Sequence, residues 1–559
     1  MQRPNVLSTP DPPAPRAAAR PALHGKETPP VPSPPAYPVD LRPCIPVHMA
    51  GQHQTLGLRE VLIQAHRIDD LALPLPPAQS ALLRLLTAIT AELTGLDDAN
   101  LSLEEWHERR TDLLTSGRGL KAQDIHDYCD AAALDLYDQR RPLLQDPRLA
   151  AQCTKTSGIN KLVLGRPAGN NIAWLSPHTD TAPRPVPSDE AFWHLLIQHY
   201  YGAAGRCTTR SAGPHTSGRA TAGPLRSTLS FHPQGATLLE TLLLHQFPYR
   251  GGPQDSPDTC PWQEPEPPDP VNPPPPATWP KRLLTGRSRH AVLLVPNADG
   301  SAATDAYLTW ATQHPAYPAT DPYLIIDTHT RAKAEQRDTP RRADADRALW
   351  RDLDALLLAG DENSTQRRPT VFDTLNDLPA PVRARLRVRV CGFDQDGRTT
   401  NSIWYTAQTP PLWNWAEEHD PPTARRIAAC RQAAEHLAAL LRTHANTAWN
   451  ETQNPATGGT PPAPRRGQRP SRWAREALAL YWPRAEQAFW NLVNHNTDEA
   501  SDPYPVFART AADVLRQAAR PDLARHQTAG PALARAVRAL AAAAAPASRR
   551  KKAARHAQP

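Results

Sequence analysis

Proline constrains this chain more than any other residue type. The 559 residues include 64 prolines but only 26 glycines. Because proline lacks a backbone N–H and fixes its own φ, it interrupts both helices and sheets. Prolines are dense in residues 1–38, where we predict a disordered Pro/Ala-rich tail, and in residues 251–280, where we predict a loop without regular structure. Regular structure is expected to begin near Val39 and to fill the stretches between and beyond these segments.

The rest of the composition is typical of a globular protein. Hydrophobic residues make up 40% and charged residues 21% of the chain, and its length suggests two or three domains. No run of 18 apolar residues occurs, and the N-terminal tail lacks the apolar segment of a signal peptide. The seven cysteines are scattered and form no CxxC pair, which argues against a disulfide framework. We therefore predict a reduced, cytoplasmic protein without a membrane segment.

The charge balance is modestly basic. Lysine and arginine total 63 against 56 acidic residues, a formal net charge of +7. Such an excess is compatible with a polyanionic partner without requiring one. Residues 546–559 form a basic tail, which either contacts nucleic acid or only aids solubility.

Apolar periodicity predicts several helices in the first half of the chain. In residues 56–66 one face carries Leu58, Val61, Leu62 and Ala65. A second helix follows Pro76-Pro77, and its apolar residues recur at steps of three and four: Leu82, Leu85, Leu86, Ile89 and Leu93. Residues 121–140 and 188–202 also follow a helical pattern.

The middle of the chain mixes strands and helices. Residues 291–295 and 323–327 are predicted strands, and Asn297-Ala-Asp-Gly300 is a plausible hairpin connection. Residues 341–358 are predicted to be helical. Residues 383–391 alternate arginine with leucine or valine, the period-two pattern of a strand with one solvated face.

Beyond residue 420 the chain consists of long Ala/Leu/Arg helices, which predict a four-helix bundle over residues 420–545. Each helix has an apolar stripe: Ile427, Cys430, Ala434, Leu437 and Leu441; Leu478, Trp482, Ala485, Phe489 and Leu492; Phe507, Ala511, Val514 and Ala518; Leu533, Val537 and Leu540. Residues 454–470 are a flexible basic connector, and a domain boundary is expected near residues 410–422. The predicted fold class is α+β: a large mixed α/β domain with long loops over residues 39–415, followed by the bundle.

Enzyme motifs are nearly absent. The chain contains no GxxxxGK[ST] phosphate loop, no GxGxxG, no HExxH and no GxSxG. His178 and Asp180, and Asp327 and His329, are pairs of the kind found in some metal and acid–base sites. With 21 histidines in the chain such pairs arise by coincidence, and neither pair has a third ligand in recognisable register. We expect no catalytic residue, no metal and no cofactor.

A glycine-rich segment, residues 202–226, is unusually long for a connector. It combines glycines and hydroxyl residues with four arginines: Arg206, Arg210, Arg219 and Arg226. Glycine lets backbone approach a ligand closely, and Arg, Ser and Thr donate hydrogen bonds to phosphate oxygens. The segment is either a phosphate-contacting loop or a solvated surface loop.

A second candidate loop follows the predicted strand at 383–391. Asp396-Gly397 is a strong turn signal and would present Gln395 and Arg398 at the tip of a hairpin. The tip either inserts polar groups into a groove or is an ordinary hairpin end.

Several segments, in their order along the chain, resemble the CasA family, the large subunit of the type I-E CRISPR Cascade complex. They include LRPCIPV (41–47), the helix LGLREVL, ALLRLLTAI (81–89), NNIAWLSPHTD, SDEAFWHLLIQHYYGAAG, PLRSTLSFHPQGATLLETLLLHQF and TGRSRHAVLLVP. The C-terminal helices resemble the family's four-helix bundle. The resemblance covers roughly residues 38–545, and the ordered set of segments carries it.

The resemblance implies a DNA-recognition subunit that is not an enzyme. In this family the α/β domain inspects the protospacer-adjacent motif of duplex DNA, mainly from the minor groove, and a glycine loop and a hairpin wedge help open the strands for the guide RNA. The implied partners are the other Cascade subunits with guide RNA, double-stranded target DNA and a separate helicase-nuclease. The alternatives are a general basic nucleic-acid-binding scaffold unrelated to CRISPR and a metal-dependent hydrolase.

The resemblance also implies site residues. The glycine loop falls on Ser217, Gly218, Arg219, Ala220 and Thr221, and the wedge falls on Gln395, Asp396, Gly397 and Arg398. The loop that docks onto the complex falls on Trp174, Leu175 and Ser176. Two departures stand out: Ala220 and Thr221 replace glycine in the loop, and Asp396-Gly397 changes the wedge, so that the wedging residue is either Gln395 or Arg398. Only Cys260 lies where some members of the family have cysteine pairs, which argues against zinc there.

Overall fold

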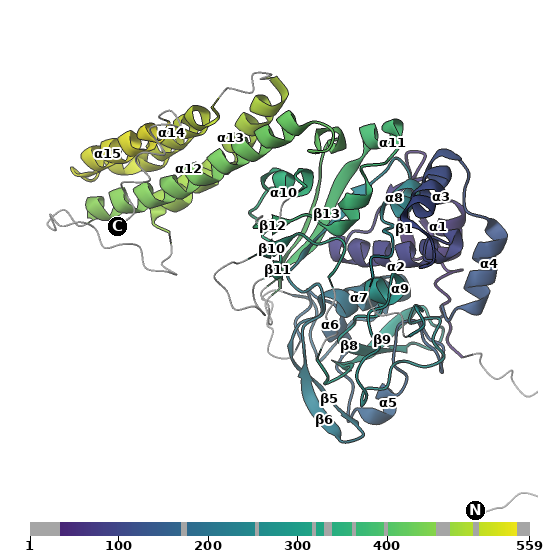
Figure 1. The fold of residues 1–559 in the computed structure, drawn as a ribbon. Coiled ribbons are helices and arrows are strands. Elements are labelled where there is room, and N and C mark those ends of the chain that lie inside the picture. The colour runs from purple at the N-terminus through teal and green to yellow at the C-terminus, as the bar shows by residue number, and fades with distance from the viewer. Residues whose placement is uncertain are drawn as a thin grey trace, which may run out of the picture. The chain divides into compact units, whose positions relative to one another are not determined.

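The computed structural model of the chain describes residues 34–168, 176–251, 256–315, 320–328, 338–359, 365–395, 401–453, 470–495 and 502–544. All helices and strands named below belong to the unit Pro35–Pro559 (Figure 1). Helices and small antiparallel sheets are mixed up to residue 415, and long helices follow. This is the α+β class expected from the sequence, whereas the tail at residues 1–33 lies outside the described residues.

The first elements form a three-stranded antiparallel sheet with one short helix. Strand β1 (Ile45–Met49) lies between β2 (Gln52–Leu56) and β3 (Ile68–Leu71), and α1 spans Leu58–Ile63. The predicted helix at 56–66 therefore exists but is shorter at both ends. Its apolar face is confirmed, because Leu58, Val61, Leu62 and Ala65 are all buried.

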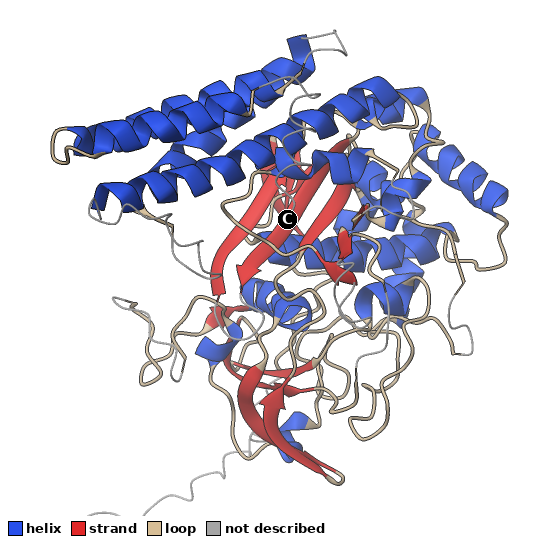
Figure 2. Cartoon of the chain, turned by 60° about the vertical axis from the view of Figure 1, so that its left-hand side comes forward, coloured by secondary structure: helices blue, strands red, loops and turns tan. Residues whose placement is uncertain are grey.

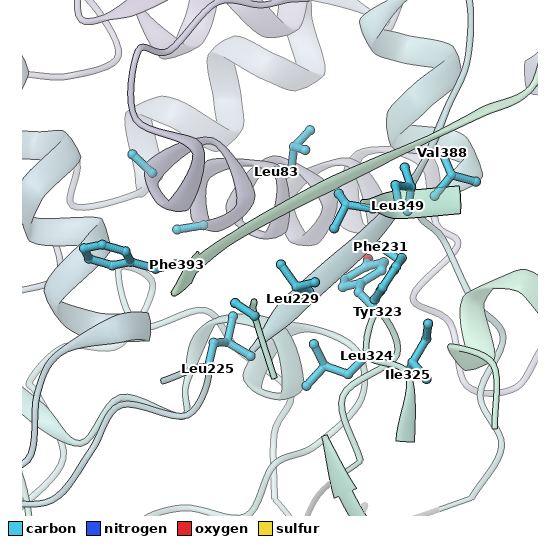
Figure 3. Packing of buried hydrophobic residues seen from close by; sticks show 14 of the residues in the cluster. Leu83, Leu225, Leu229, Phe231, Tyr323, Leu324, Ile325, Leu349, Val388 and Phe393 are labelled. Atoms are coloured by element: carbon cyan, nitrogen blue, oxygen red, sulfur yellow. The ribbon is translucent and has the colours of Figure 1, made fainter. Parts of the chain in front are cut away.

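Helix α2 (Pro76–Thr94) begins with two prolines at its first positions and ends at Gly95, whose φ of +65° provides a left-handed cap. Every residue from Pro77 to Ala91 is buried, so the helix is covered on all sides rather than on one face. It packs against α7, α8, α9 and strand β13. Figure 3 shows its Leu83 near the core around Leu229 and Phe231.

Arg84 is the charged residue at the centre of this buried helix. Its guanidinium pairs with Asp321 (Nη1–Oδ2 2.7 Å), donates to Ser230 Oγ (2.9 Å) and lies over the Tyr323 ring (4.9 Å). The side chains of Arg84 and Asp321 are both almost fully buried, and an ion pair in such a place must be hydrogen-bonded to be tolerated. The pair joins α2 to the strand that carries Ser230 and to the segment around Asp321.

The remaining short helices surround α2. They are α3 (Leu103–Thr115), α4 (Ala122–Ala131), α5 (Leu149–Gln152), α6 (Ile159–Leu162), α7 (Ser188–Tyr201), α8 (Leu238–Leu244) and α9 (Lys281–Thr285). The prediction at 188–202 is confirmed, whereas the helix predicted over 121–140 ends at Ala131. Beyond it, Asp135 accepts hydrogen bonds from the backbone N–H groups of Tyr37 and Tyr137, and this holds the segment as an irregular bridge.

Four further antiparallel sheets lie in the described part of this region. Their strands are β4 (Val186–Pro187), β5 (Gly205–Ala212), β6 (His215–Ala220), β7 (Leu229–Gln234), β8 (His290–Pro296), β9 (Ala302–Trp310), β10 (Ile326–Thr328), β11 (Asp338–Pro340), β12 (Gln366–Arg367), β13 (Arg387–Gln395) and β14 (Asn401–Gln408). The strand orders are β14-β13-β7, β4-β9-β8, β11-β10-β12 and β5-β6. The strand predicted at 291–295 is confirmed as β8, and Asn297–Gly300 connects it to β9 as a hairpin.

Two predictions in the middle region are only partly confirmed: of the strand predicted at 323–327, Ile326 and Asp327 lie in β10, and the helix predicted at 341–358 forms only near its end. Tyr323, Leu324 and Ile325 are buried but lie outside β10, because only single backbone bonds, such as that from Phe231 N to Tyr323 O, tie them to the core (Figure 3). Of residues 341–358, only the 3-10 turn η2 (Leu349–Asp352) and α10 (Leu353–Leu357) are helical. At the start of this range the backbone is not helical but lies beside Ile325, because Arg341 N donates to Ile325 O.

The strand predicted at 383–391 is shifted along the chain. Helix α11 (Ala380–Arg385) occupies its start, and β13 begins at Arg387; the short turns η3 (Thr370–Thr374) and η4 (Trp413–Trp415) flank this part. Val388 and Val390 are buried as expected. Arg389 does not face solvent freely, because its guanidinium is bound to Asp70 of β3.

The Pro-rich segment 256–280 contains no helix or strand among its described residues, as predicted, but it is firmly packed. Trp262 is buried and donates from Nε1 to Tyr128 Oη at 2.8 Å, and Trp279 donates to Phe247 O at 3.1 Å. Cys260 is fully buried, and burial raises the pKa of its thiol. All seven cysteines are free.

Four helices pack together at the C-terminal end: α12 (Pro421–Gln453), α13 (Arg472–His495), α14 (Tyr504–Leu523) and α15 (Ala529–Ala542) (Figure 2). The stripes of α12 and α14 are buried as predicted. On α15 the buried residues are Ala529, Ala532, Ala536 and Leu540, and the predicted Leu533 and Val537 are partly buried against the same core. The connector at 454–469 lies outside the described residues, and the domain boundary near 410–422 stays a prediction.

Glu435 connects the bundle to the preceding region. Its carboxylate pairs with Arg347 (2.9 Å) and Arg351 (2.8 Å), and the centre of the Trp350 ring lies 4.7 Å from that of Phe489.

None of the described helices combines the length and the apolarity that crossing a lipid bilayer requires.

Five buried histidines make the stability of this fold sensitive to acid, and burial holds the pKa of one of them, His232, well below its ordinary value. Burial lowers the pKa of His194, His199 and His290 to about 4 and that of His245 to about 3, from an ordinary value of 6.5. Below pH 6.5 the unfolded chain therefore takes up protons that the folded chain excludes, and stability falls as the pH decreases toward 4.

We expect this acid sensitivity to weaken when one of these histidines is removed. In His245→Gln, the loss of unfolding free energy between pH 7 and pH 5.5 should be about 1 kcal/mol smaller than in the wild type, because one proton uptake is absent. Urea unfolding at a series of pH values measures this difference. Equal pH dependence of the two proteins would contradict the assignment.

Candidate nucleic-acid interface

The glycine-rich segment 205–220 is a β-hairpin, which corrects the prediction of an irregular loop. Strands β5 and β6 pair antiparallel from Gly205↔Ala220 to Ala212↔His215. Gly213 opens the two-residue connection with φ +54°, the conformation that primed hairpin turns favour. On the inner face Ala212 and Ala220 pack against the fully buried Trp310 of β9. These alanines and Trp310 form a small core of their own, which holds the hairpin against β9.

Two of the four arginines in the segment are structural. Arg210 is fully buried: it pairs with Asp146 (2.7 Å), donates to Gln152 Oε1 (2.7 Å) and to Trp310 O (3.0 Å), and its guanidinium lies 5.2 Å from the centre of the Trp310 ring. Burial lowers the pKa of Arg210, and the Asp146 carboxylate opposes this shift. Arg226 is also buried and donates to Tyr201 O at 3.2 Å. Neither side chain faces solvent.

The other two arginines form an exposed cross-strand pair. Arg206 of β5 lies directly opposite Arg219 of β6, and both side chains are exposed. A register irregularity between Arg206 and Arg210 separates the exposed Arg206 from the buried Thr208, which a regular strand would place on the same face. Neither guanidinium has an ion-pair or hydrogen-bond partner among the described residues. Like charges directly opposite destabilise a hairpin, and an anion bound between them would relieve the repulsion.

The residues assigned to the glycine loop occupy β6 and its end. Ser217 O accepts from Trp310 Nε1 (2.9 Å), and Thr221 Oγ1 accepts from Arg289 Nε (3.2 Å). A Cβ on Gly218 would meet Thr209 Oγ1 at 3.0 Å, so the close strand packing favours glycine there. Ala220 is buried and faces inward. Arg219 is the one charged residue among these five, and its side chain is exposed.

The candidate wedge lies at the end of the β13–β14 hairpin. The two strands pair from Arg389↔Gln408 to Gln395↔Asn401, with a shift between Asp394 and Gln395. This pairing agrees with the expected hairpin, whereas Asp396, Gly397 and Arg398 lie outside the described residues. On the exposed strand β14, Ile403 is 54% and Trp404 38% exposed.

Gln395 points into the protein rather than away from it. Its side chain is only 4% exposed. Oε1 accepts from Ser227 N at 3.4 Å, and Nε2 donates to Tyr201 O at 3.5 Å. The structure therefore brings the base of the wedge turn to residues 225–228, the segment that leads out of the β5–β6 hairpin.

The remaining predicted site residues are either outside the described residues or make only local contacts. Trp174 and Leu175 lie outside the described residues, and Ser176 accepts from His178 N through Oγ at 3.2 Å. Asp180 accepts from Asn160 Nδ2 at 3.3 Å, and Asp327 is bound to Arg341, whereas His329 is outside the described residues. No cluster of three or more metal-ligating side chains occurs in the described part of the chain.

Comparisons with known proteins match this chain over most of its length. The sequence profile of the family described as CRISPR-associated protein Cse1 matches residues 41–525. The "CRISPR-associated protein CasA/Cse1" of Thermus thermophilus is 28% identical over 226 residues, which are 40% of this chain. That alignment spans 41% of the relative, less than half of its length.

Solved structures extend the match. A chain described as "CRISPR RNA-guided surveillance complex" is 36% identical with a TM-score of 0.78, and the superposition covers 91% of this chain and 100% of that one. A crystal structure of Cse1 from Acidimicrobium ferrooxidans is 21% identical with a TM-score of 0.65, covering 91% and 98% of the two chains, and it shares the fold.

The contrast between buried and exposed arginines of the hairpin can be tested by unfolding. Arg210→Met leaves the buried Asp146 with Arg148 alone as an ionic partner among the described residues, so we expect the unfolding free energy to fall by about 2 kcal/mol. Arg219→Ala, made as the exposed counterpart on the same hairpin, should not lower stability, because it removes the like-charge contact with Arg206. Urea unfolding of the full-length chain measures both. An equal loss in the two variants would contradict the assignment.

Proposed function

Because the chain belongs to the CRISPR-associated Cse1 family, we propose that it acts as the large subunit of a CRISPR RNA-guided surveillance complex of type I-E. In that complex it reads a short motif in duplex DNA, helps to separate the strands so that the guide RNA can pair, and supports recruitment of a helicase-nuclease. It binds and positions nucleic acid and does not itself catalyse a reaction. The match to the family's sequence profile over residues 41–525 supports the assignment to the complex.

The exposed Arg206–Arg219 pair is the observation that carries the DNA contact. Two guanidinium groups side by side on a rigid hairpin, with no acidic partner among the described residues, suit adjacent phosphate oxygens. Phosphate contacts position a protein on DNA without reading sequence, so motif reading falls to neighbouring groups near the groove. The minor groove offers a degenerate code, which suits recognition of a short permissive motif.

Strand opening is proposed to depend on the turn at the end of the β13–β14 hairpin. Since Gln395 is buried, we assign the inserted group to the turn residues Asp396, Gly397 and Arg398 rather than to Gln395. Base pairing with guide RNA then supplies sequence specificity, and protein–backbone contacts help to offset the cost of opening the duplex. Trp174, Leu175 and Ser176 are proposed to dock onto the rest of the complex, and the helices α12–α15 to brace the DNA.

Removing the arginine pair tests the DNA contact. In the assembled complex, Arg206→Ala and Arg219→Ala should each weaken duplex binding several-fold for motif-bearing and motif-free DNA alike. Each should also reduce the slope of log K against log salt by about 0.9, the value for one lost phosphate contact. Titration of labelled duplex at several salt concentrations gives both quantities.

The matched control is Arg140→Ala, which removes an exposed arginine that is distant in sequence from both hairpins. It should change neither affinity nor slope. Unchanged binding in both hairpin variants would exclude the pair from the DNA contact.

Replacing the turn tests strand opening. Exchange of residues 396–398 for Gly-Ser-Gly should leave initial duplex binding intact but slow the appearance of unpaired thymines, because the group that separates the strands is lost. Permanganate reactivity over time follows the opening. Opening at the wild-type rate in this variant would contradict the role of the turn.

A further inference from the structure

We infer that Gln395 is a positioning residue that ties the base of the wedge hairpin to the exit of the β5–β6 hairpin, so that motif reading and strand opening are mechanically coupled. This inference rests on the proposed function. The inference goes beyond that function because it gives one buried side chain the role of transmitting the position of the β5–β6 hairpin to the β13–β14 hairpin.

The first observation is where the backbone ladder stops. Strands β7 and β13 pair up to Leu229↔Gly392, and among the described residues no further β7–β13 pair occurs toward the wedge turn. Beyond that point β13 continues for three residues with β14 alone as its partner. The Gln395 side chain takes over there, because its Oε1 reaches Ser227 N on the segment that precedes β7.

The second observation is a shared acceptor at the end of a helix. Tyr201 is the last residue of α7, and carbonyls in the last turn of a helix have no intrahelical partner. Tyr201 O accepts from Gln395 Nε2 and also from Arg226 Nη1, at 3.2 Å. One carbonyl thus connects the end of α7, the exit of the β5–β6 hairpin and the end of β13.

The third observation is the backbone of Ser227. Its φ of +63° lies in the left-handed region, which is unfavourable for a residue with a side chain, and its hydroxyl is buried without a hydrogen-bond partner among the described residues. Its backbone is held from two sides, by Gln395 through the N–H and by Ala343 N through the carbonyl. Contacts from neighbours therefore maintain the strained conformation.

These contacts explain why the amide is suited to coupling. Its side chain bridges Ser227 N (3.4 Å) and Tyr201 O (3.5 Å), so a displacement of residues 221–228 acts directly on the end of β13. When DNA shifts residues 221–228, the base of the wedge hairpin must follow or lose its contacts. Loss of the amide should therefore affect motif reading as well as opening.

The experiment uses Gln395→Met, which keeps about the same side-chain volume and removes the hydrogen bonds to Ser227 N and Tyr201 O. Gln246→Met is the matched control, since Gln246 is equally buried and donates to two carbonyls, of Thr87 and Leu242, both at 3.1 Å. Hydrogen exchange of residues 221–228 is measured first in the DNA-free, full-length chain. The preference of the assembled complex for motif-bearing over motif-free duplex is measured second.

We expect Gln395→Met to speed exchange at 221–228 and to reduce the motif preference about fivefold, and Ser227→Gly, which keeps the N–H and relieves the positive φ, to retain the preference. Gln246→Met should change neither quantity. Unchanged exchange in Gln395→Met would overturn the contact, and faster exchange with a wild-type motif preference would overturn the coupling. Faster exchange in the DNA-free Gln395→Met chain, together with a wild-type complex that shows no motif preference, would support the contact and reject the proposed function instead.

Discussion

The ion pair between Arg84 and Asp321 is the interaction on which the α/β region depends. It lies on a helix that is buried on every side, and the same guanidinium reaches Ser230 in β7. Because β7 pairs with β13, the position of α2 is passed directly to the hairpin that carries the candidate wedge. Replacing Asp321 would leave the buried Arg84 without an ionic partner among the described residues, which is far more costly than losing a surface contact. The pair therefore fixes the register between the helical layer and the sheet that serves the interface.

Helices were the part of this fold that could be predicted from the sequence. The stripes of α12 and α14 are visible because a helix that buries one face repeats its apolar residues every three or four positions. The same signal overestimated the helix after Ala131, where Asp135 captures backbone N–H groups of Tyr37 and Tyr137. The acceptor is close in sequence to only one of these donors, so no local pattern shows where the helix stops.

The candidate interface was predictable in composition but not in geometry. Arg206 and Arg219 were two arginines among four, and only the pairing of β5 with β6 separates them from the buried Arg210 and Arg226. The strands themselves were missed because their inner face is alanine and threonine, which gives no strong alternation without Trp310 beneath it. Tyr201 and Ser227 act through backbone atoms, and no residue type at those positions announces that. The family resemblance inferred from ordered segments is confirmed by the profile match over residues 41–525.

The proline-rich segment at 256–280 has a consequence for how this chain reaches its native state. Its tryptophans donate to Tyr128 and to Phe247 O rather than to neighbours within the segment, and Tyr128 is 134 positions away from Trp262 in sequence. The segment also has hydrogen bonds of its own, such as that from Cys260 N to Gln263 Oε1, but its tryptophans are held by residues outside it. Contacts between residues so distant in sequence close a long loop, which is entropically costly. The placement of both tryptophans therefore depends on helix α4 and the chain around Phe247 being in place.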